Sequence, residues 1–194
     1  MGTDTLPERA QPRHGRRTVQ PSGVERRLDP DDLIVSKTDL RGVITYANES
    51  FLRVSRYAED EVLGQPHNLI RHPDMPRAVF ALLWETVAAG QEVFAYVDNL
   101  AADGAHYWVL ANVTPTFDTG GTVIGYHSSR RAPAPQAIAG VRPVYDLLLT
   151  EERRHPNARA ATAASSALLS SLLAERAMSY DEFVWSLIGG GEHR

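Results

Sequence analysis

The chain of 194 residues contains no cysteine. This absence excludes disulfide bonds, thiolate metal sites, cysteine nucleophiles, c-type haem attachment and photosensors that form a cysteinyl adduct. The sequence also has no run of about 20 apolar residues, the length needed to cross a bilayer. Its Arg- and Pro-rich start contains no apolar segment of the kind found in signal peptides. We therefore expect a cytoplasmic protein with no membrane insertion.

Signature motifs of several large enzyme families are missing as well. The sequence has no Gly-x-Ser-x-Gly elbow, no Walker phosphate-binding loop and no Gly-x-Gly-x-x-Gly dinucleotide fingerprint. The formal net charge of −4 gives no reason to expect nucleic acid or an anionic membrane as a partner. These absences predict that the protein is not an enzyme.

Composition divides the chain into four parts. Residues 1–30 hold four prolines and almost no apolar periodicity, which predicts a disordered N-terminal tail. Residues 31–132 alternate between short strand and helix patterns and are expected to form one domain. Residues 133–188 are rich in Ala, Leu, Glu and Arg, which predicts a C-terminal helical extension. Residues 189–194 are expected to be a flexible tail.

The central part predicts an α+β fold. Short helices are expected after the N-cap residue Asn48 and around residues 59–63, and a longer one around residues 79–87. Apolar and β-branched runs bounded by Gly-containing turns predict five strands. They lie at residues 33–35, 43–46, 93–100, 105–117 and 123–130. This order favours a five-stranded antiparallel sheet with short helices on one face.

The C-terminal part predicts two or three helices. Pro143 and the pair His155-Pro156 are expected to interrupt them, because proline lacks the amide proton that a helix interior uses. Apolar residues recur at helical spacing, which predicts a packing or dimerisation face. In the first helix this face consists of Ile138, Val141, Val144, Tyr145 and Leu148.

Residues 64–76, Gly-Gln-Pro-His-Asn-Leu-Ile-Arg-His-Pro-Asp-Met-Pro, concentrate polar groups just before the longer helix. Three prolines make a continuous helix unfavourable there. Pro76 suits the first helical position, and Asp74 is placed to cap the free amides of that helix. The guanidinium of Arg71 offers a two-pronged donor for a phosphate or a carbonyl group.

This segment resembles the PAS domain of bacterial aerotaxis receptors. The resemblance also includes "ANESFLRVSRY" before it and "DGAHYWVLANVTP" and "GYHSSR" after it, and it spans roughly residues 32–131. It implies a PAS fold that holds FAD noncovalently and signals through the redox state of the flavin. It further implies that the flavin is contacted by Asn48, Arg71, His72 and Asp74.

Strand alternation adds candidates from the sheet. Tyr107, Val109, Ala111 and Val113 are expected on one face, where small and apolar side chains would admit a flat ring; Trp108, Leu110 and Asn112 are expected on the other. The similarity to flavin-binding photosensory PAS domains implies ring contacts for Asn99 and His127.

Each polar candidate has a simpler interpretation. His72 could be a loop histidine bonded to backbone, and Asp74 a plain helix cap. His67 is expected to face solvent. The spacing of His67, His72 and Asp74 matches no known ligand pattern, so no metal site is predicted.

The chain differs from typical aerotaxis domains after Phe94, where they carry a tryptophan and several basic residues. This difference leaves FMN, haem bound through His67 or His72, and an empty pocket open as alternatives to FAD. A flavin oxidoreductase and a ligand-free protein-interaction or dimerisation module also stay open.

The resemblance implies a sensor of redox state or oxygen in aerotaxis or chemotaxis signalling. Because the sequence shows no membrane anchor, coiled-coil, kinase, cyclase or DNA-binding motif, we expect a stand-alone soluble form that acts through residues 134–188. The expected partner is a chemoreceptor or a histidine kinase, and a homodimer is expected.

Overall fold

The computed structural model describes residues 19–188. The expected flexible tail at residues 189–194 and most of the expected N-terminal tail lie outside the described residues. Within residues 19–188, no helix is both long enough and apolar enough to cross a bilayer.

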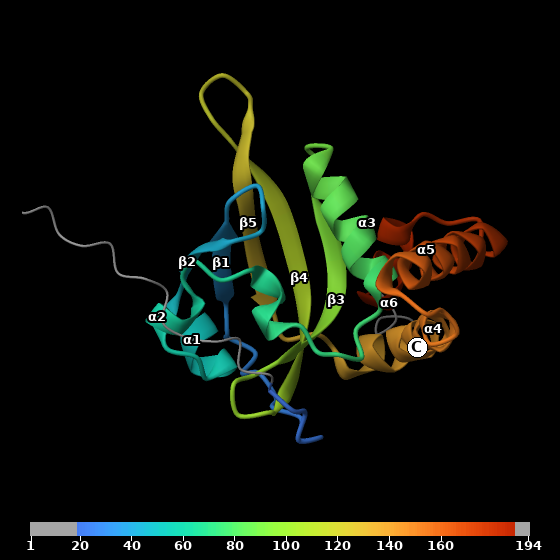
Figure 1. Cartoon of the computed structure of the whole chain (residues 1–194), viewed down its shortest axis with the longest axis horizontal. Helices are drawn as coiled ribbons and strands as arrows, with labels where there is room; N and C mark the ends of the chain where they lie inside the picture. Colours follow the sequence, from blue (N-terminus) through green and yellow to red (C-terminus); the bar gives the residue numbers. More distant parts are fainter. Residues whose placement is uncertain (1–18, 189–194) are drawn as a thin grey trace, which may run out of the picture.

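A five-stranded sheet forms the centre of the molecule, in the spatial order β2-β1-β5-β4-β3 (Figure 1). All paired neighbours are antiparallel. The strands are β1 Ile34–Thr38, β2 Ile44–Ala47, β3 Val93–Leu100, β4 His106–Phe117 and β5 Val123–Arg131. The predicted α+β class and the predicted strand positions are therefore confirmed to within a few residues.

Four helices lie on one face of the sheet (Figure 1), where short helices and one longer helix are predicted, but the helix at residues 67–70 is not among the predicted ones. The four helices are α1 Glu49–Ser55, α2 Glu59–Val62, the 3-10 helix η1 His67–Ile70 and α3 Arg77–Ala88. Asn48 starts α1, because its Oδ1 accepts a hydrogen bond from the Phe51 amide at 2.9 Å. Gly64 lies beyond the end of α2 with a φ of +77°, a conformation that glycine adopts without strain.

Residues 19–30 belong to the predicted N-terminal tail, and residues 22–26 pair with the folded domain. Their backbone runs beside the start of β4, where the Arg26 amide donates to the His106 carbonyl at 2.7 Å and the His106 amide donates to Val24 at 2.9 Å. Arg26 also donates a side-chain hydrogen bond to the Val54 carbonyl at 2.7 Å. These pairings hold the segment although it has few apolar residues to bury.

The C-terminal extension consists of α4 Pro135–Glu152, α5 Ala158–Glu175 and α6 Tyr180–Ile188. The predicted interruption at Pro143 is wrong, because α4 continues through it. Pro143 is exposed, while the buried residues Val141 and Tyr145 hold the two halves of the helix against the protein. The predicted break near His155-Pro156 is confirmed.

The extension packs around the edge strand β3. Helices α4 and α6 lie against the outer face of the sheet, where the rings of Trp108 and Tyr145 stack with centroids 6.2 Å apart and those of Phe94 and Trp185 are 4.8 Å apart. Helix α5 packs against α3 and α4 (Figure 1). The predicted apolar face of α4 is thus used for packing within the chain.

Candidate functional site

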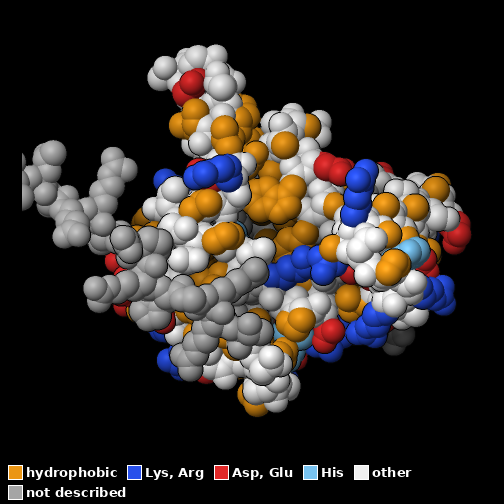
Figure 2. Space-filling model, in the orientation of Figure 1, with side chains coloured by type: hydrophobic (Ala, Val, Ile, Leu, Met, Phe, Trp, Pro, Cys, Tyr) orange, Lys and Arg blue, Asp and Glu red, His pale blue; other side chains and the backbone are white. Residues whose placement is uncertain are grey.

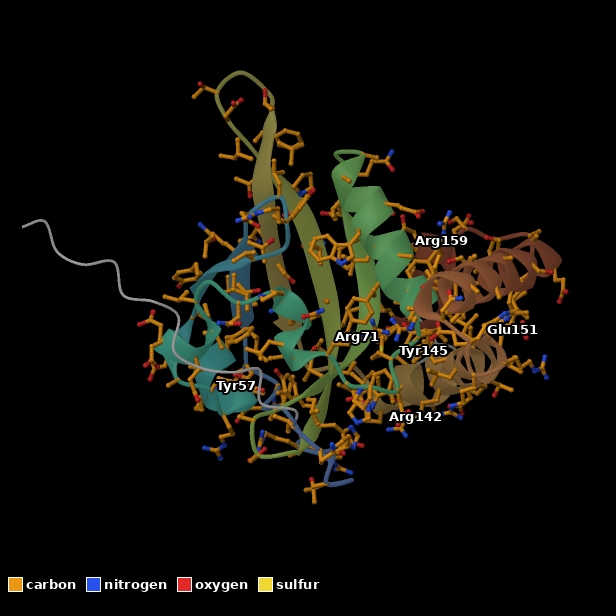
Figure 3. All side chains as sticks on the ribbon, in the orientation of Figure 1. Tyr57, Arg71, Arg142, Tyr145, Glu151 and Arg159 are labelled. Carbon is orange, nitrogen blue, oxygen red and sulfur yellow. The ribbon has the colours of Figure 1, made fainter. Side chains whose placement is uncertain are left out.

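A pocket that is partly open to solvent lies between the inner face of the sheet and the helices η1 and α3, and its volume is about 60 Å³. Figure 2 shows apolar side chains gathered at the centre of this face of the molecule, with basic side chains close to them. Figure 3 labels Arg71 in that region, near α3 and β3.

One wall of the pocket is apolar and is built by strand alternation. Ala111 and Val113 of β4 and Val97 of β3 point into it, which confirms the face predicted for β4. Phe80, Leu83 and Trp84 of α3 line the opposite side. The Trp84 indole reaches Gly42, where an added Cβ would lie 2.9 Å from the ring, so Trp84 extends across the pocket. Aromatic and small apolar walls of this kind suit a flat ring.

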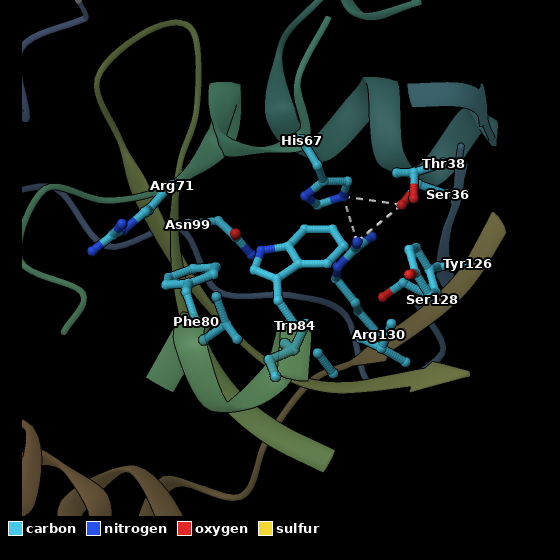
Figure 4. Close-up of a pocket in the computed structure, with 14 residues that line it drawn as sticks. Ser36, Thr38, His67, Arg71, Phe80, Trp84, Asn99, Tyr126, Ser128 and Arg130 are labelled. Atoms are coloured by element: carbon cyan, nitrogen blue, oxygen red, sulfur yellow. Dashed lines mark hydrogen bonds between the residues drawn. The ribbon is translucent and has the colours of Figure 1, made fainter. Parts of the chain in front are cut away.

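A polar cluster occupies one side of the pocket, where His67, Arg130 and Ser36 contact each other (Figure 4). Arg130 Nη2 lies 2.6 Å from His67 Nε2 and 2.9 Å from Ser36 Oγ, and Ser36 Oγ is 3.1 Å from His67 Nε2. A guanidinium can only donate, so His67 Nε2 accepts and the imidazole proton belongs on Nδ1. The expected solvent-facing position of His67 is therefore wrong, because η1 turns the ring onto β5.

Arg130 is the cation of this cluster. Its side chain is buried, and within residues 19–188 no acidic side chain forms an ion pair with it. Burial lowers the pKa of Arg130 to about 10, so it stays charged at neutral pH. Burial, and then repulsion from Arg130, hold the pKa of His67 well below its usual value, so His67 is neutral.

Unused hydrogen-bonding groups point to a ligand. Seven buried side-chain nitrogen or oxygen atoms in the described part of the chain have no partner, and four of them belong to residues that line the pocket. The four are Thr38 Oγ1, Asn99 Nδ2, Ser128 Oγ and Arg130 Nη1. Buried polar groups in native proteins are nearly always paired, so these groups indicate where a bound molecule would complete the network.

Asn99 and Arg71 are the two predicted site residues that line the pocket. Arg71 lies on the side opposite the His67 cluster (Figure 4). Its Nη2 donates to the Met75 carbonyl at 2.6 Å, and its guanidinium carbon lies 4.5 Å from the centre of the Phe80 ring. Burial, and then repulsion from Arg77, lower the pKa of Arg71.

Asn48 and His127 do not line the pocket. The Asn48 side chain is used within the fold, since Oδ1 accepts from Phe51 and Val35 and Nδ2 donates to the Leu33 carbonyl. His127 alternates with the pocket residues of β5 and so points to the outer face of the sheet. Burial, and then repulsion from Lys37, lower the pKa of His127.

His72 and Asp74 are also outside the pocket. His72 is buried and its Nδ1 accepts from the Asp74 amide at 3.2 Å, which is the loop role considered as its alternative. Asp74 is exposed and does not cap α3; it forms an ion pair with Arg153 at 3.4 Å. The carboxylate at the start of α3 is Glu152, whose Oε1 accepts from the Arg77 amide at 2.6 Å.

Sequence reasoning missed most of the polar lining of the pocket. The missed residues are Ser36, Thr38, Trp84, Tyr126, Ser128 and Arg130, and His67 was considered only as a haem ligand. Ser36 alternates with Thr38, and Ser128 with Arg130, so each pair shares one strand face. That signal was present in the sequence, but a shift of one residue in β5 assigned His127 to the pocket instead. Nowhere in residues 19–188 do three His, Cys, Asp or Glu side chains gather in a way that could hold a metal ion.

Comparison with known proteins identifies the class. The family described as PAS fold matches residues 33–128, and this part of the chain belongs to that family. Among curated proteins, the aerotaxis receptor of Escherichia coli is 44% identical over 121 residues, which are 62% of this chain and 24% of the receptor. The resemblance to the aerotaxis receptor PAS domain is thereby confirmed.

More distant relatives include other signalling proteins. The nitrogen fixation regulatory protein of Klebsiella pneumoniae is 32% identical over 104 residues, which cover 54% of this chain and 21% of that protein. The chain thus spans about a quarter or less of these curated relatives. Among solved structures, the light state of the blue-light photoreceptor Aureochrome1 LOV aligns with a TM-score of 0.49 and 23% identity, over 62% of this chain and 91% of that one.

Proposed function

We propose that the pocket binds a flavin, FAD, and that the domain senses redox state or oxygen through it, in signalling of the aerotaxis or chemotaxis type. The observation that carries the proposal is the set of four unused polar atoms facing an apolar wall. A flavin has a flat apolar body and an edge of carbonyl and ring-nitrogen acceptors. Asn99 Nδ2 and Arg130 Nη1 would donate to that edge, and the hydroxyls of Thr38 and Ser128 could donate or accept.

The basic residues support the diphosphate form of the cofactor. Arg71 lines the pocket, and repulsion from Arg77 contributes to its lowered pKa, so the two cations lie within each other's field. A diphosphate between them would relieve this repulsion and could use the two-pronged donor of Arg71. FMN carries one phosphate and would be stabilised less than FAD by the charges of Arg71 and Arg77.

The pocket residues could respond differently to two redox states. A bound flavin would supply a reversible redox centre whose polar edge gains electrons and protons on reduction. Arg130, a buried cation without a carboxylate partner, would stabilise added negative charge nearby. His67 accepts from Arg130 and could take up a proton when that charge is offset. Such differential contacts are the requirement for a ligand state to shift a protein conformation.

Haem fits these residues less well. His67 is the histidine among the pocket-lining residues, and its Nε2 is already 2.6 Å from Arg130, which leaves that nitrogen unsuited to iron.

A ligand-free protein-interaction module is the second candidate, favoured by the position of Trp84 across the pocket. It predicts a colourless protein.

Signal output is part of the same proposal. The extension formed by α4, α5 and α6 would pass the state of the pocket to a protein partner, a chemoreceptor or a histidine kinase, and a homodimer would be the acting unit. The domain would work in the cytoplasm and would catalyse no reaction.

The test is an absorption spectrum of the purified protein in air and after reduction, with identification of any molecule released on denaturation. We expect flavin bands that bleach on reduction, and released FAD. A colourless protein that releases neither flavin nor haem and takes up no added FAD would contradict the proposal.

Substitutions locate the site. Asn99→Ala and Arg71→Ala should each lower FAD affinity about tenfold, because each removes a donor to a polar ligand group. His127→Ala is the matched control, since it lies on the outer face of the sheet. Titration of FAD into the apoprotein, followed by flavin fluorescence, measures the effect. If Asn99→Ala and Arg71→Ala bind FAD with the same affinity as His127→Ala, this pocket is excluded as the FAD site.

A further inference from the structure

The end of α4 holds the start of α3 through one carboxylate. Glu152 Oε1 accepts from the Arg77 amide at 2.6 Å and from the Ala78 amide at 3.4 Å, although 75 residues separate Glu152 from Arg77. A carboxylate at a helix start pairs with free amides and with the positive end of the helix dipole. The nearby side chain of Pro76, the N-cap residue, offers no such acceptor. The first turn of α3 is thus capped by the C-terminal extension.

The same carboxylate also binds α5. Ser165 Oγ donates to Glu152 Oε1 at 2.9 Å, and Ser165 is fully buried where α5 packs. The Glu152 side chain is only 9% exposed, so these contacts are shielded from water. Glu152 therefore connects α3, α4 and α5 at a single point. An unpaired carboxylate at this depth would be costly, which makes the three-way arrangement specific.

The pocket is connected to Glu152 through the residues that precede α3. Arg71 lines the pocket and its guanidinium donates to the Met75 carbonyl, two residues before the amide that Glu152 binds. Next to Glu152, Arg153 lies 3.4 Å from Asp74, so the extension contacts the same loop twice. A ligand that draws the Arg71 guanidinium away from Met75 would remove one of the contacts that hold the residues before α3; the Met75 amide also donates to the His72 carbonyl, and Met75 Sδ accepts from the Asp98 amide.

We propose that Glu152 couples the conformation of the loop from Arg71 to Arg77 to the packing of α5. We call this coupling the Glu152 latch. In one arrangement Arg71 holds Met75 and Glu152 holds both α3 and Ser165. In the other, the loop moves, the cap at Arg77 is lost, and α5 loses its contact with the end of α4. The proposal rests on the proposed function for the nature of the ligand, but the latch itself needs no ligand to be tested.

A double-mutant cycle in the ligand-free protein tests the coupling. The variants are Arg71→Ala, Glu152→Ala and the two combined, and the measurement is amide hydrogen exchange in residues 77–80 and 158–175. We expect each single change to speed exchange in both segments about fivefold, the size of a lost helix cap. The double variant should add little beyond either single one, because in the proposal Arg71 at Met75 and Glu152 at Arg77 hold the same loop in the same arrangement.

Two further variants control the result. Glu152→Gln keeps an oxygen acceptor for the α3 amides and should restore slow exchange in residues 77–80. Glu151→Ala removes a neighbour that pairs with Arg154 and His155, so exchange in residues 77–80 should match the wild type. If Glu152→Ala prevents folding, Ser165→Ala removes the hydroxyl that contacts Glu152 and, within α5, the Thr162 carbonyl, while leaving the cap of α3 in place, and it should speed exchange in residues 158–175.

Three results would overturn the latch. They are additive effects of Arg71→Ala and Glu152→Ala, an unchanged α3 first turn in Glu152→Ala, or an α5 unaffected by Arg71→Ala. With FAD bound, reduction should change exchange in residues 158–175 in the wild type and leave it unchanged in Glu152→Ala. An absence of FAD binding would contradict the proposed function alone, since the cycle is measured without it.

Discussion

A buried arginine lies beside a histidine in the pocket of this domain. Arg130 donates to His67 Nε2 in a part of the pocket where neither has a carboxylate partner among residues 19–188. Protonation of His67 would place two cations in contact and would remove the acceptor that Arg130 uses. The fold therefore favours the neutral imidazole, and burial, followed by repulsion from Arg130, lowers the pKa of His67.

This pair predicts a pH dependence of stability. Because the pKa of His67 is lower in the folded chain than in the unfolded one, the unfolded state binds more protons as the pH falls below about 6.5. The contribution of His67 is fully present above that pH and is lost as the pH falls towards its folded pKa. The free energy of unfolding of His67→Gln should fall less steeply than that of the wild type between about pH 7 and pH 5.

Urea unfolding at several pH values measures this slope. His127→Gln is the comparison, since the pKa of His127 is also lowered but less far, on the outer face of the sheet. Its effect on the slope should be smaller than that of His67→Gln. Identical slopes for the wild type and His67→Gln would show that the imidazole is not held neutral.

At the same scale, the sequence predicted part of the pocket. Arg71 follows from the resemblance to the aerotaxis receptor PAS domain, and Asn99 from its strand position relative to flavin-binding photosensory PAS domains. Arg130 was missed because β5 was assigned one residue out of register, and the contact of Arg130 with His67 depends on how η1 turns over β5, which no local pattern contains. His72 and Asp74 lie in the expected segment, but their side chains bond within the loop and to Arg153.

Among the elements, the pairing of β1 with β5 sets the position of the polar pocket wall. Thr38 pairs with Tyr126, and both line the pocket. Gly125, the residue before Tyr126, lies so close to β1 that an added Cβ would be 2.4 Å from the Thr38 carbonyl oxygen. Since that neighbour is backbone, it can move only if the strands separate.

Gly125→Ala should therefore lower the free energy of unfolding by about 3 kcal/mol, the upper range for overpacking a tight contact. FAD affinity should fall with it, because Thr38 and Ser128 would move apart. Gly120→Ala, in the exposed hairpin before β5, meets only the Asp118 side chain at 3.3 Å and should cost under about 1 kcal/mol. Urea unfolding of both variants measures the two free energies. Equal losses of free energy of unfolding in the two variants would mean that the loss comes from glycine flexibility and not from the contact between β1 and β5.

The elements were the most predictable level of the structure. Strand alternation, glycine turns and the Asn48 cap are local signals, and they placed all five strands. Two features depended on distant residues and were not predictable. Helix α4 continues through Pro143 because Val141 and Tyr145 are buried on either side of it, and α3 is capped by Glu152 from another element.

For the molecule as a whole, the C-terminal extension completes the fold. It covers the outer face of β3 and β4. The inner face of the same two strands carries Asn99 and Ala111, which line the pocket. One face of this strand pair therefore contacts the extension and the other forms a wall of the pocket. Tyr145 makes the deepest link, since its hydroxyl donates to the Tyr96 carbonyl at 2.7 Å and lies 3.5 Å from the Tyr180 hydroxyl. Burial raises the pKa of Tyr145 well above its usual value and that of Tyr180 to about 12, so both hydroxyls keep their protons.

This link predicts that the sheet and the extension unfold together. Tyr145→Phe removes the donor to a buried carbonyl and should lower the free energy of unfolding by about 1 to 2 kcal/mol. Tyr46→Phe, on an exposed side chain of β2, should change it by less than about 0.5 kcal/mol. Tryptophan fluorescence reports on Trp84 in α3, Trp108 in β4 and Trp185 in α6. Fluorescence and far-UV circular dichroism should give one coincident urea transition for each variant. Separate transitions in the wild type would mean that the extension is an independent unit, and the coupling between pocket and α5 would then lack its structural basis.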